Sequence, residues 1–186
     1  YKGIGIPHAA YRAVETVEDV VAFSKVNGFP FILKPIDADS CIDTYKLDSA
    51  SDLPKALSPS RRWMVEEFID AEEYQICCLV HAGKVVATFV ASNPAPILKV
   101  FEGQMNANIT LAPDETNPIE AQKVMQRIVD GLGLDRGYVH GEFFIKSNGE
   151  FVMSEIAARM SGCEAPMNHG MAYGFDFLGA VLDCYM

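Results

Sequence analysis

The chain has 186 residues, a formal net charge of −10 and a hydrophobic share of 49%, which suits a packed core and excludes a disordered chain. The length fits one domain or one unit of two lobes, and the acidic charge without a basic run argues against a nucleic-acid partner. No apolar run reaches membrane-spanning length, no secretory signal is visible, and the five cysteines lack zinc spacing, so we expect a cytoplasmic protein with reduced thiols and no membrane partner.

The sequence predicts short strands interspersed with helices. In chain order the expected elements are a helix begun by Thr16 and closed by Asn27-Gly28, strands over 31–35 and 44–47, a short helix capped by Ser49 and ending at Leu57, strands over 64–69, 73–80 and 84–92, a helix capped by Asn117, and a last helix over 177–185. Ser58-Pro59-Ser60 marks the candidate boundary, so residues 1–60 are expected to form a small lobe and residues 61–186 a larger lobe. An irregular segment, residues 94–117, follows the strand over 84–92 and precedes the helix capped by Asn117. Its length is typical of functional or mobile loops.

The stretch over residues 137–159 predicts a β-hairpin. Asn148-Gly149 is the strongest short signal for a two-residue type I′ loop, because both loop residues need a positive φ. With this loop, Ser147 pairs with Glu150, and Phe144 faces Met153. Strand side chains alternate between faces, which predicts one apolar core-facing side and one side with polar groups. The core-facing side takes Val139, Phe143, Ile145, Val152 and Ile156, and the other takes His140, Glu142, Phe144, Met153, Glu155 and Ala157.

The same register places Glu142 directly across from Glu155. Two opposed carboxylates repel each other, and the pair is relieved either by a raised pKa or by a cation between the acids. Mg²⁺ suits the second solution, and Arg159 four residues beyond Glu155 favours it because guanidinium is a common partner of phosphate. A solvated face with both charges screened remains the alternative. His140 shares this face, either as a substrate or phosphate contact or as a packed supporting residue.

Taken together, these segments resemble the ATP-grasp superfamily of carboxylate–amine or carboxylate–thiol ligases, of the carbamoyl-phosphate-synthase and biotin-carboxylase type. Gly5-Ile6-Pro7 and the run from Gly28 to Pro35 are similar to the family's opening, GIPxP … GxPxxxKP, and the resemblance covers nearly the whole chain. It implies an α+β fold of two lobes with nucleotide between them and an antiparallel sheet in the larger lobe. Lys34 is then implied to reach the nucleotide phosphates.

The run from Val65 to Ile69 looks like the family's adenine hinge. The resemblance implies that Glu66 and the backbone of Glu67 and Ile69 meet the adenine, and that Glu73 meets the ribose hydroxyls. The cofactor-binding residues implied by the resemblance are Lys34, Ser40, Glu66, Glu67, Phe68, Ile69 and Glu73.

The hairpin falls where the family has its magnesium acids. Glu142 and Glu155 match both positions, and Arg159 matches the arginine of the family's ExNxR run. The resemblance therefore implies ATP with Mg²⁺, or Mn²⁺, as cofactors. It also implies Lys34 and Arg159 as catalytic residues that balance the charge of the transferred phosphoryl group.

The sequence departs from the family pattern in three places. The loop over residues 37–43 has three acids and no glycine where the family's loop is Gly-rich, which leaves Ser40 as a donor to phosphate. Ala157 stands where the family's ExNxR run has Asn, so one expected oxygen ligand is absent. The sequence does not decide whether one metal ion or two metal ions bind. The family's upstream lobe precedes the first residue of this chain, and this N-terminal lobe of the same protein is an implied partner.

The resemblance implies an ATP- and Mg²⁺-dependent ligase that forms an acyl phosphate from a small-molecule carboxylate and joins it to an amine or another nucleophile. A non-catalytic nucleotide-binding module, or a degenerate fragment, is the main alternative, because Ala157 and the acidic loop are signs of lost chemistry. A proton-sharing glutamate pair in a metal-free hydrolase is a third reading. The sequence does not specify the substrate, which in this family depends on the upstream lobe and on loops such as 95–117.

Overall fold

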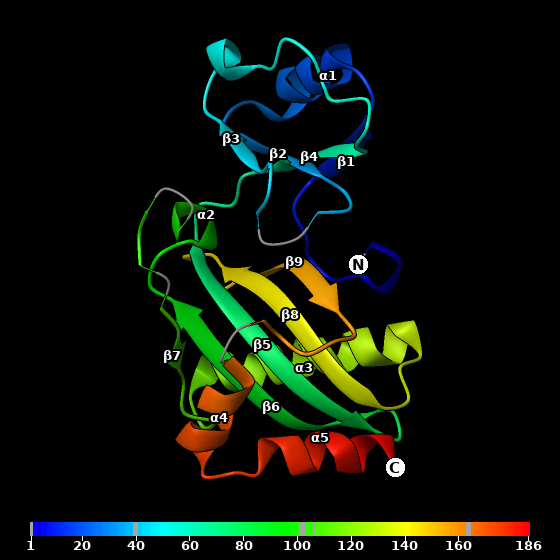
Figure 1. The fold of residues 1–186 in the computed structure, drawn as a ribbon, viewed down its shortest axis with the longest axis vertical. Helices are drawn as coiled ribbons and strands as arrows, with labels where there is room; N and C mark the ends of the chain where they lie inside the picture. Colours follow the sequence, from blue (N-terminus) through cyan, green and yellow to red (C-terminus); the bar gives the residue numbers. More distant parts are fainter. Residues whose placement is uncertain (1, 39–40, 101–102, 106, 163–164) are drawn as a thin grey trace. The chain divides into compact units, whose positions relative to one another are not determined.

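The structure is a computed structural model that describes residues 2–38, 41–100, 103–105, 107–162 and 165–186. These residues form two compact units, each with its own antiparallel sheet (Figure 1). The smaller unit comprises residues 9–70 and 97–104, and the larger unit comprises residues 1–8, 71–96 and 105–186. Within the described ranges, no helix has the length and apolar character needed to cross a membrane.

The smaller unit is a four-stranded sheet with one main helix. The strands are β1 (Tyr11–Val14), β2 (Phe31–Pro35), β3 (Tyr45–Leu47) and β4 (Trp63–Glu67), in the order β1-β4-β2-β3. Helix α1 (Val17–Asn27) packs its buried Val20 and Phe23 against Phe31, Val65 and other residues of this sheet. A 3₁₀ turn (Ala50–Asp52) and the short helix α2 (Ile97–Val100) complete the unit.

The ends of α1 follow the sequence prediction. The Asp19 amide donates to Thr16 Oγ1 at 3.2 Å, and the Thr16 amide donates to Asp19 Oδ2 at 3.1 Å, so the capping box is present. Gly28 ends the helix with a φ of 77°, a conformation that glycine adopts without a steric penalty. The helix predicted from Ser49 to Leu57 is wrong beyond its first turn, because only the 3₁₀ turn forms.

The larger unit is a five-stranded sheet with helices on both faces. Its strand order is β7-β6-β5-β8-β9, and all neighbours are antiparallel. The strands are β5 (Glu72–His81), β6 (Lys84–Asn93), β7 (Ile109–Thr110), β8 (Gly137–Ile145) and β9 (Phe151–Ala157). The helices are α3 (Thr116–Leu132), α4 (Ala165–Tyr173) and α5 (Phe177–Tyr185), with a 3₁₀ turn at Lys2–Ile4.

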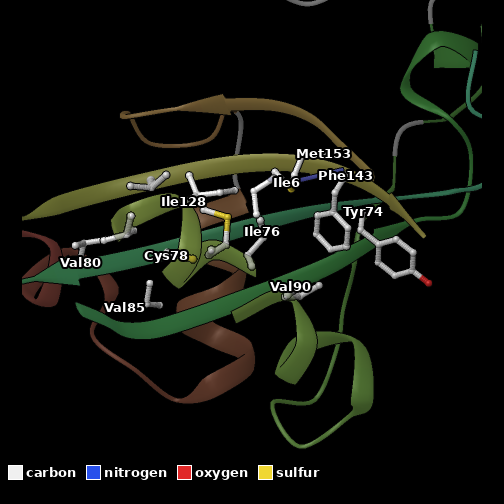
Figure 2. Close-up of a cluster of buried hydrophobic side chains, with 14 residues drawn as sticks. Ile6, Tyr74, Ile76, Cys78, Val80, Val85, Val90, Ile128, Phe143 and Met153 are labelled. Carbon is white, nitrogen blue, oxygen red and sulfur yellow. The ribbon is translucent and has the colours of Figure 1, made fainter. Parts of the chain in front are cut away.

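The two faces of this sheet have different cores. On one face, Ile76 and Cys78 of β5 pack with Phe143, Met153 and residues of α3, as Figure 2 shows for part of the cluster. On the other face, Cys77 packs with Phe89, Tyr138 and the buried residues of α5. Adjacent Cys77 and Cys78 therefore point to opposite faces, as strand alternation predicts.

The predicted division between the lobes needs a correction. Strand β4 forms hydrogen-bonded ladders with β1 and β2, so residues 61–70 belong to the smaller unit and not to the larger one. The boundary lies after Asp70. The first eight residues, by contrast, belong to the larger unit, where Ile6 is part of the core next to α3.

The hairpin loop is one residue longer than predicted. The Gly149 amide donates to Lys146 O at 2.8 Å and the Lys146 amide donates to Glu150 O at 3.0 Å, which leaves a three-residue loop over 147–149. Gly149 has a φ of 82°, and Asn148 keeps a negative φ. This arrangement is a common alternative to the two-residue loop, and the prediction of a type I′ turn is wrong.

A β-bulge offsets the longer loop. Phe143 lies across from Met153, but Glu142 lies across from Glu155, so Ser154 is the extra residue on β9. The predicted pairing of Phe144 with Met153 is therefore wrong, and Met153 lies in the core with 2% of its surface exposed. The predicted pairing of Glu142 with Glu155 is confirmed.

Candidate functional site

A row of polar side chains crosses the larger sheet on the face opposite α3. Gln75 of β5 lies directly across from Glu142 of β8, which in turn lies across from Glu155 of β9. On the other side of β5, Glu73 lies across from Asn93 of β6. Residues directly opposite in an antiparallel ladder share a face, and so do residues two apart on one strand. We call these five residues the acid face.

The acid pair at the end of this row is open to solvent. The side chain of Glu142 is 30% exposed and that of Glu155 is 55% exposed. Arg159 lies beyond the end of β9, and its Nη2 atom is 4.0 Å from Glu155 Oε1. Its Nη1 atom donates to Met160 O at 2.9 Å. The hairpin thus brings the two predicted metal ligands and the predicted arginine together.

The donor set at the acid pair fits Mg²⁺ of the kind that nucleotides carry. Mg²⁺ takes one or two protein carboxylates and completes its shell with water and phosphate oxygens, so two carboxylates are a sufficient protein contribution. Across the described part of the chain, no group of three or more His, Cys, Asp or Glu side chains could hold a metal ion by itself. The pair therefore fits a metal that arrives with a phosphate ligand.

His140 lies next to Glu142 on the same face of the sheet, and its side chain is buried. Its Nε2 atom is 3.5 Å from Glu142 Oε1, its Nδ1 atom is 3.7 Å from Cys77 Sγ, and only 5% of the residue is exposed. Burial on its own lowers the pKa of His140, but the hydrogen bonds to Cys77 and Glu142 outweigh it and raise the pKa to about 9. His140 is therefore a buried residue that packs between Cys77 and Glu142.

In the smaller unit, the predicted phosphate lysine and the first hinge residue contact each other. Lys34 Nζ is 2.6 Å from Glu66 Oε1, and the two side chains are 25% and 16% exposed. The ladder between β2 and β4 explains the contact, because Ile32 lies across from Glu66 and Lys34 is two residues further on the same face.

The remaining hinge residues follow β4. Glu67 exchanges two hydrogen bonds with Ala10, since its amide donates to Ala10 O at 2.8 Å and its Oε2 accepts from the Ala10 amide at 3.2 Å. The ring of Phe68 lies under Lys46 Nζ, 4.5 Å from the ring centroid, and Ile69 is 7% exposed. The Glu67 amide is thus already bonded within the unit.

Glu73 and Glu72 differ in burial as strand alternation predicts. Glu73 is 8% exposed and belongs to the acid face, whereas Glu72 is exposed and accepts a hydrogen bond from Tyr74 Oη at 2.5 Å. In the larger unit, only Glu73 of this pair faces the same side as the metal acids. Its assignment to the ribose stays a prediction.

The acidic loop is less repulsive to phosphate than its composition suggests. Asp37 lies 3.6 Å from Arg62, and Asp43 lies 3.0 Å from Arg61 (atom pairs Oδ2–Nε and Oδ2–Nη2). The sequence alone shows the acidic residues of the loop but not their pairing with Arg61 and Arg62, which are distant in sequence. Ser40 lies outside the described residues, and its predicted role stays a prediction.

Two buried amides on the acid face, Gln75 and Asn93, were missed by sequence reasoning. They are 8% and 6% exposed. The signal in the sequence was a polar residue at alternate positions of two apolar strands, but only the pairing of β5 with β6 and β8 brings them to the acids.

The sequence is similar to the ATP-grasp domain family and to known ligases. A family described as ATP-grasp domain matches residues 27–166. The L-arginine-specific L-amino acid ligase of Bacillus subtilis is 25% identical over 168 residues, which cover 85% of this chain and 40% of the relative. The D-alanine–D-alanine ligase of Pseudomonas entomophila is 25% identical over 193 residues, which cover 98% of this chain and 59% of the relative.

Comparison of structures agrees on the fold. The crystal structure of an L-amino acid ligase from Bacillus licheniformis matches with a TM-score of 0.78 at 20% identity, covering 97% of this chain and 44% of that one. The chain thus spans between 40% and 59% of the length of these relatives. The structural match supports the α+β fold, and because the family match extends over most of the sequence, this chain belongs to the ATP-grasp family.

Proposed function

We propose that the chain is the ATP-binding part of an ATP- and Mg²⁺-dependent ligase that joins a small carboxylate to an amine. The observation that carries the proposal is the acid pair, because Glu142 and Glu155 are direct cross-strand neighbours on a solvent-accessible face. Two opposed carboxylates repel each other and a cation between them relieves this repulsion, and the resemblance assigns the family's metal acids to these two positions. The names of two sequence relatives, both ligases of amino acids, support amino acids as the first substrates to test.

The reaction requires the protein mainly to position the substrates and to balance the negative charge of the phosphates. The substrate carboxylate attacks the γ-phosphorus of ATP and ADP leaves, and the amine then attacks the acyl carbon while phosphate leaves and the amine loses a proton. Mg²⁺, when bound by Glu142 and Glu155, supplies positive charge to the phosphate oxygens. Lys34 and Arg159 balance the remaining negative charge of the transferred group, and Glu66 to Ile69 and Glu73 hold the nucleoside.

ADP release in the presence of Mg·ATP tests the ligase. We expect release to require both an amino-acid carboxylate and an amine, and to fall to the background level in Glu142→Gln. The measurement is a coupled ADP assay on the isolated chain with pairs of amino acids. The matched control is Glu120→Gln, because Glu120 is a half-exposed residue of α3 whose carboxylate lies 2.7 Å from Lys123 Nζ.

A second candidate is a module that binds nucleotide without turnover. Ala157, in place of the family's Asn, favours it because an oxygen ligand is absent next to the acid pair. Binding of Mg·ATP without ADP release for any substrate pair supports this second function. Absence of both binding and release contradicts both functions.

The ribose assignment predicts unequal effects of two neighbouring substitutions. Glu73→Ala is expected to weaken ADP binding by roughly 1.5–3 kcal/mol, the contribution of a hydrogen bond to a charged group. Glu72→Ala is expected to leave ADP affinity nearly unchanged, because Glu72 is exposed and points to the other face of the sheet. Calorimetric titration with ADP measures both, and equal losses in the two variants would reject the assignment.

A further inference from the structure

Two amide groups on the acid face have donors without an acceptor. Among the described residues, Gln75 Nε2 and Asn93 Nδ2 are buried and have no hydrogen-bond partner. The residues are 8% and 6% exposed, so bulk water does not reach most of their surface. Buried amide donors are nearly always bonded in native proteins, and an unpaired one calls for a physical explanation.

The orientation of Asn93 is set by a neighbour. Asn108 Nδ2 donates to Asn93 Oδ1 at 2.5 Å, so the oxygen of the Asn93 amide is already engaged. Turning the Asn93 amide over by itself would place two NH₂ groups against each other. With Asn108 as the donor, the unpaired group is the NH₂ of Asn93, which has no acceptor among the described residues.

Gln75 lies between two residues with assigned roles. It is two residues from Glu73 on the same strand, and it lies directly across from Glu142 on β8. Its partner on the other side is Ala91 of β6, whose side chain offers no acceptor. The donor of Gln75 therefore lies between the proposed ribose ligand and the proposed metal ligand.

The chemistry of the missing acceptor follows from this position. Adjacent strands are about 4.8 Å apart, so a group held by the metal acids lies within reach of an amide one strand away. A nucleotide that runs from Glu73 to the metal presents phosphate oxygens in this interval. Neutral amides suit these oxygens, because they donate without adding a charge that competes with the metal for the carboxylates.

We propose that Gln75 donates a hydrogen bond to an oxygen of the metal-chelated polyphosphate of the bound nucleotide. Asn93, directly across from the proposed ribose ligand Glu73, donates to the nucleoside end of the same ligand. The inference rests on the proposed function, since it requires that the acid face binds Mg·ATP. It provides an acceptor for two buried amide donors that have none among the described residues.

The test compares nucleotide affinity with the stability of the free chain. Gln75→Met removes the donor at similar length, and Asn93→Asp removes the donor while keeping an acceptor for Asn108. Calorimetric titrations use adenosine and Mg·ATP as separate probes. Gln122→Glu is the matched control, because Gln122 is an exposed amide on α3, which covers the opposite face of the sheet.

Mg·ATP affinity is expected to fall about tenfold or more in Gln75→Met, and adenosine affinity to stay within about twofold of wild type. In Asn93→Asp, adenosine and Mg·ATP are both expected to bind more weakly, because Asn93 lies across from Glu73. Without ligand, Gln75→Met is expected to raise the melting temperature, because it removes an unpaired buried donor. Gln122→Glu is expected to change neither quantity.

Each other outcome has a definite meaning. If wild type binds Mg·ATP and both variants bind it equally well, the donor assignment is overturned and the proposed function stands. Equal losses for adenosine and Mg·ATP in Gln75→Met assign Gln75 to the nucleoside and overturn its phosphate role. A lower melting temperature in ligand-free Gln75→Met shows an internal partner and overturns the inference without any ligand. A wild type that binds neither probe overturns the proposed function together with this inference.

Discussion

Glu155→Gln is expected to remove most of the rise in melting temperature that Mg·ATP produces in this chain. The ligand binds the folded state only, so it stabilises that state by an amount that grows with its concentration relative to Kd. A free ligand concentration of about 100 times Kd adds about 2.7 kcal/mol to the free energy of unfolding. Replacing one of the two proposed carboxylate ligands by a neutral amide weakens the binding of the metal ion. It therefore also weakens the binding of the phosphates that the metal ion contacts. A thermal-shift titration with Mg²⁺ and ATP together measures the loss.

The ligand-free protein is expected to respond much less to the same substitution. Relief of repulsion between Glu142 and Glu155 raises the melting temperature slightly, but the Glu155 side chain is 55% exposed and Arg159 lies 4.0 Å away, so the repulsion is already screened. The matched control is Glu150→Gln on the same hairpin, where the carboxylate pairs with Lys146 at 3.1 Å. A ligand response in Glu155→Gln equal to that of Glu150→Gln would mean that the acid pair is a solvated face.

The confirmed acid pairing shows what local sequence signals do and do not predict. Alternation and an Asn-Gly turn signal placed Glu142 across from Glu155. The loop has three residues and β9 has a bulge at Ser154, and the two shifts cancel at the acids but not at Met153. A bulge depends on how β8 and β9 pack on α3, which the hairpin sequence alone does not contain.

Long-range pairing limited the rest of the site prediction. Gln75 becomes a candidate only because β5 lies next to β8, although 67 positions separate Gln75 from Glu142 in the sequence numbering. The arginines at 61 and 62 pair with Asp43 and Asp37 for the same reason. The short strand β7 and helix α4 lacked a clear periodic pattern, and tertiary contacts with β6 and α5 hold them in place.

Lys34→Met is expected to weaken binding of Mg·ATP by roughly 1.5–3 kcal/mol, the contribution of a hydrogen bond between charged groups. The family pattern implies that Lys34 contacts the nucleotide phosphates, and this role is a prediction. The Nζ atom of Lys34 is 2.6 Å from Glu66 Oε1, and both side chains are largely shielded from solvent. The substitution therefore removes a cation from the phosphates and also leaves the Glu66 carboxylate without this partner. Adenosine affinity is expected to change less, because it lacks the phosphates. Titration calorimetry with adenosine and Mg·ATP separates the two effects.

Loss of the ion pair itself makes a control essential. Lys25→Met removes the same charge from the exposed last turn of α1 in the same unit, so it matches the change in net charge without touching Glu66. Glu66→Gln removes the other partner of the ion pair and keeps Lys34, which shows how much of the loss comes from the broken contact. If Lys34→Met and Glu66→Gln weaken Mg·ATP and adenosine to the same extent, Lys34 supports the hinge and does not contact phosphate. If Lys34→Met weakens Mg·ATP alone, the phosphate role stands, because only a group that reaches the phosphates discriminates between the two ligands.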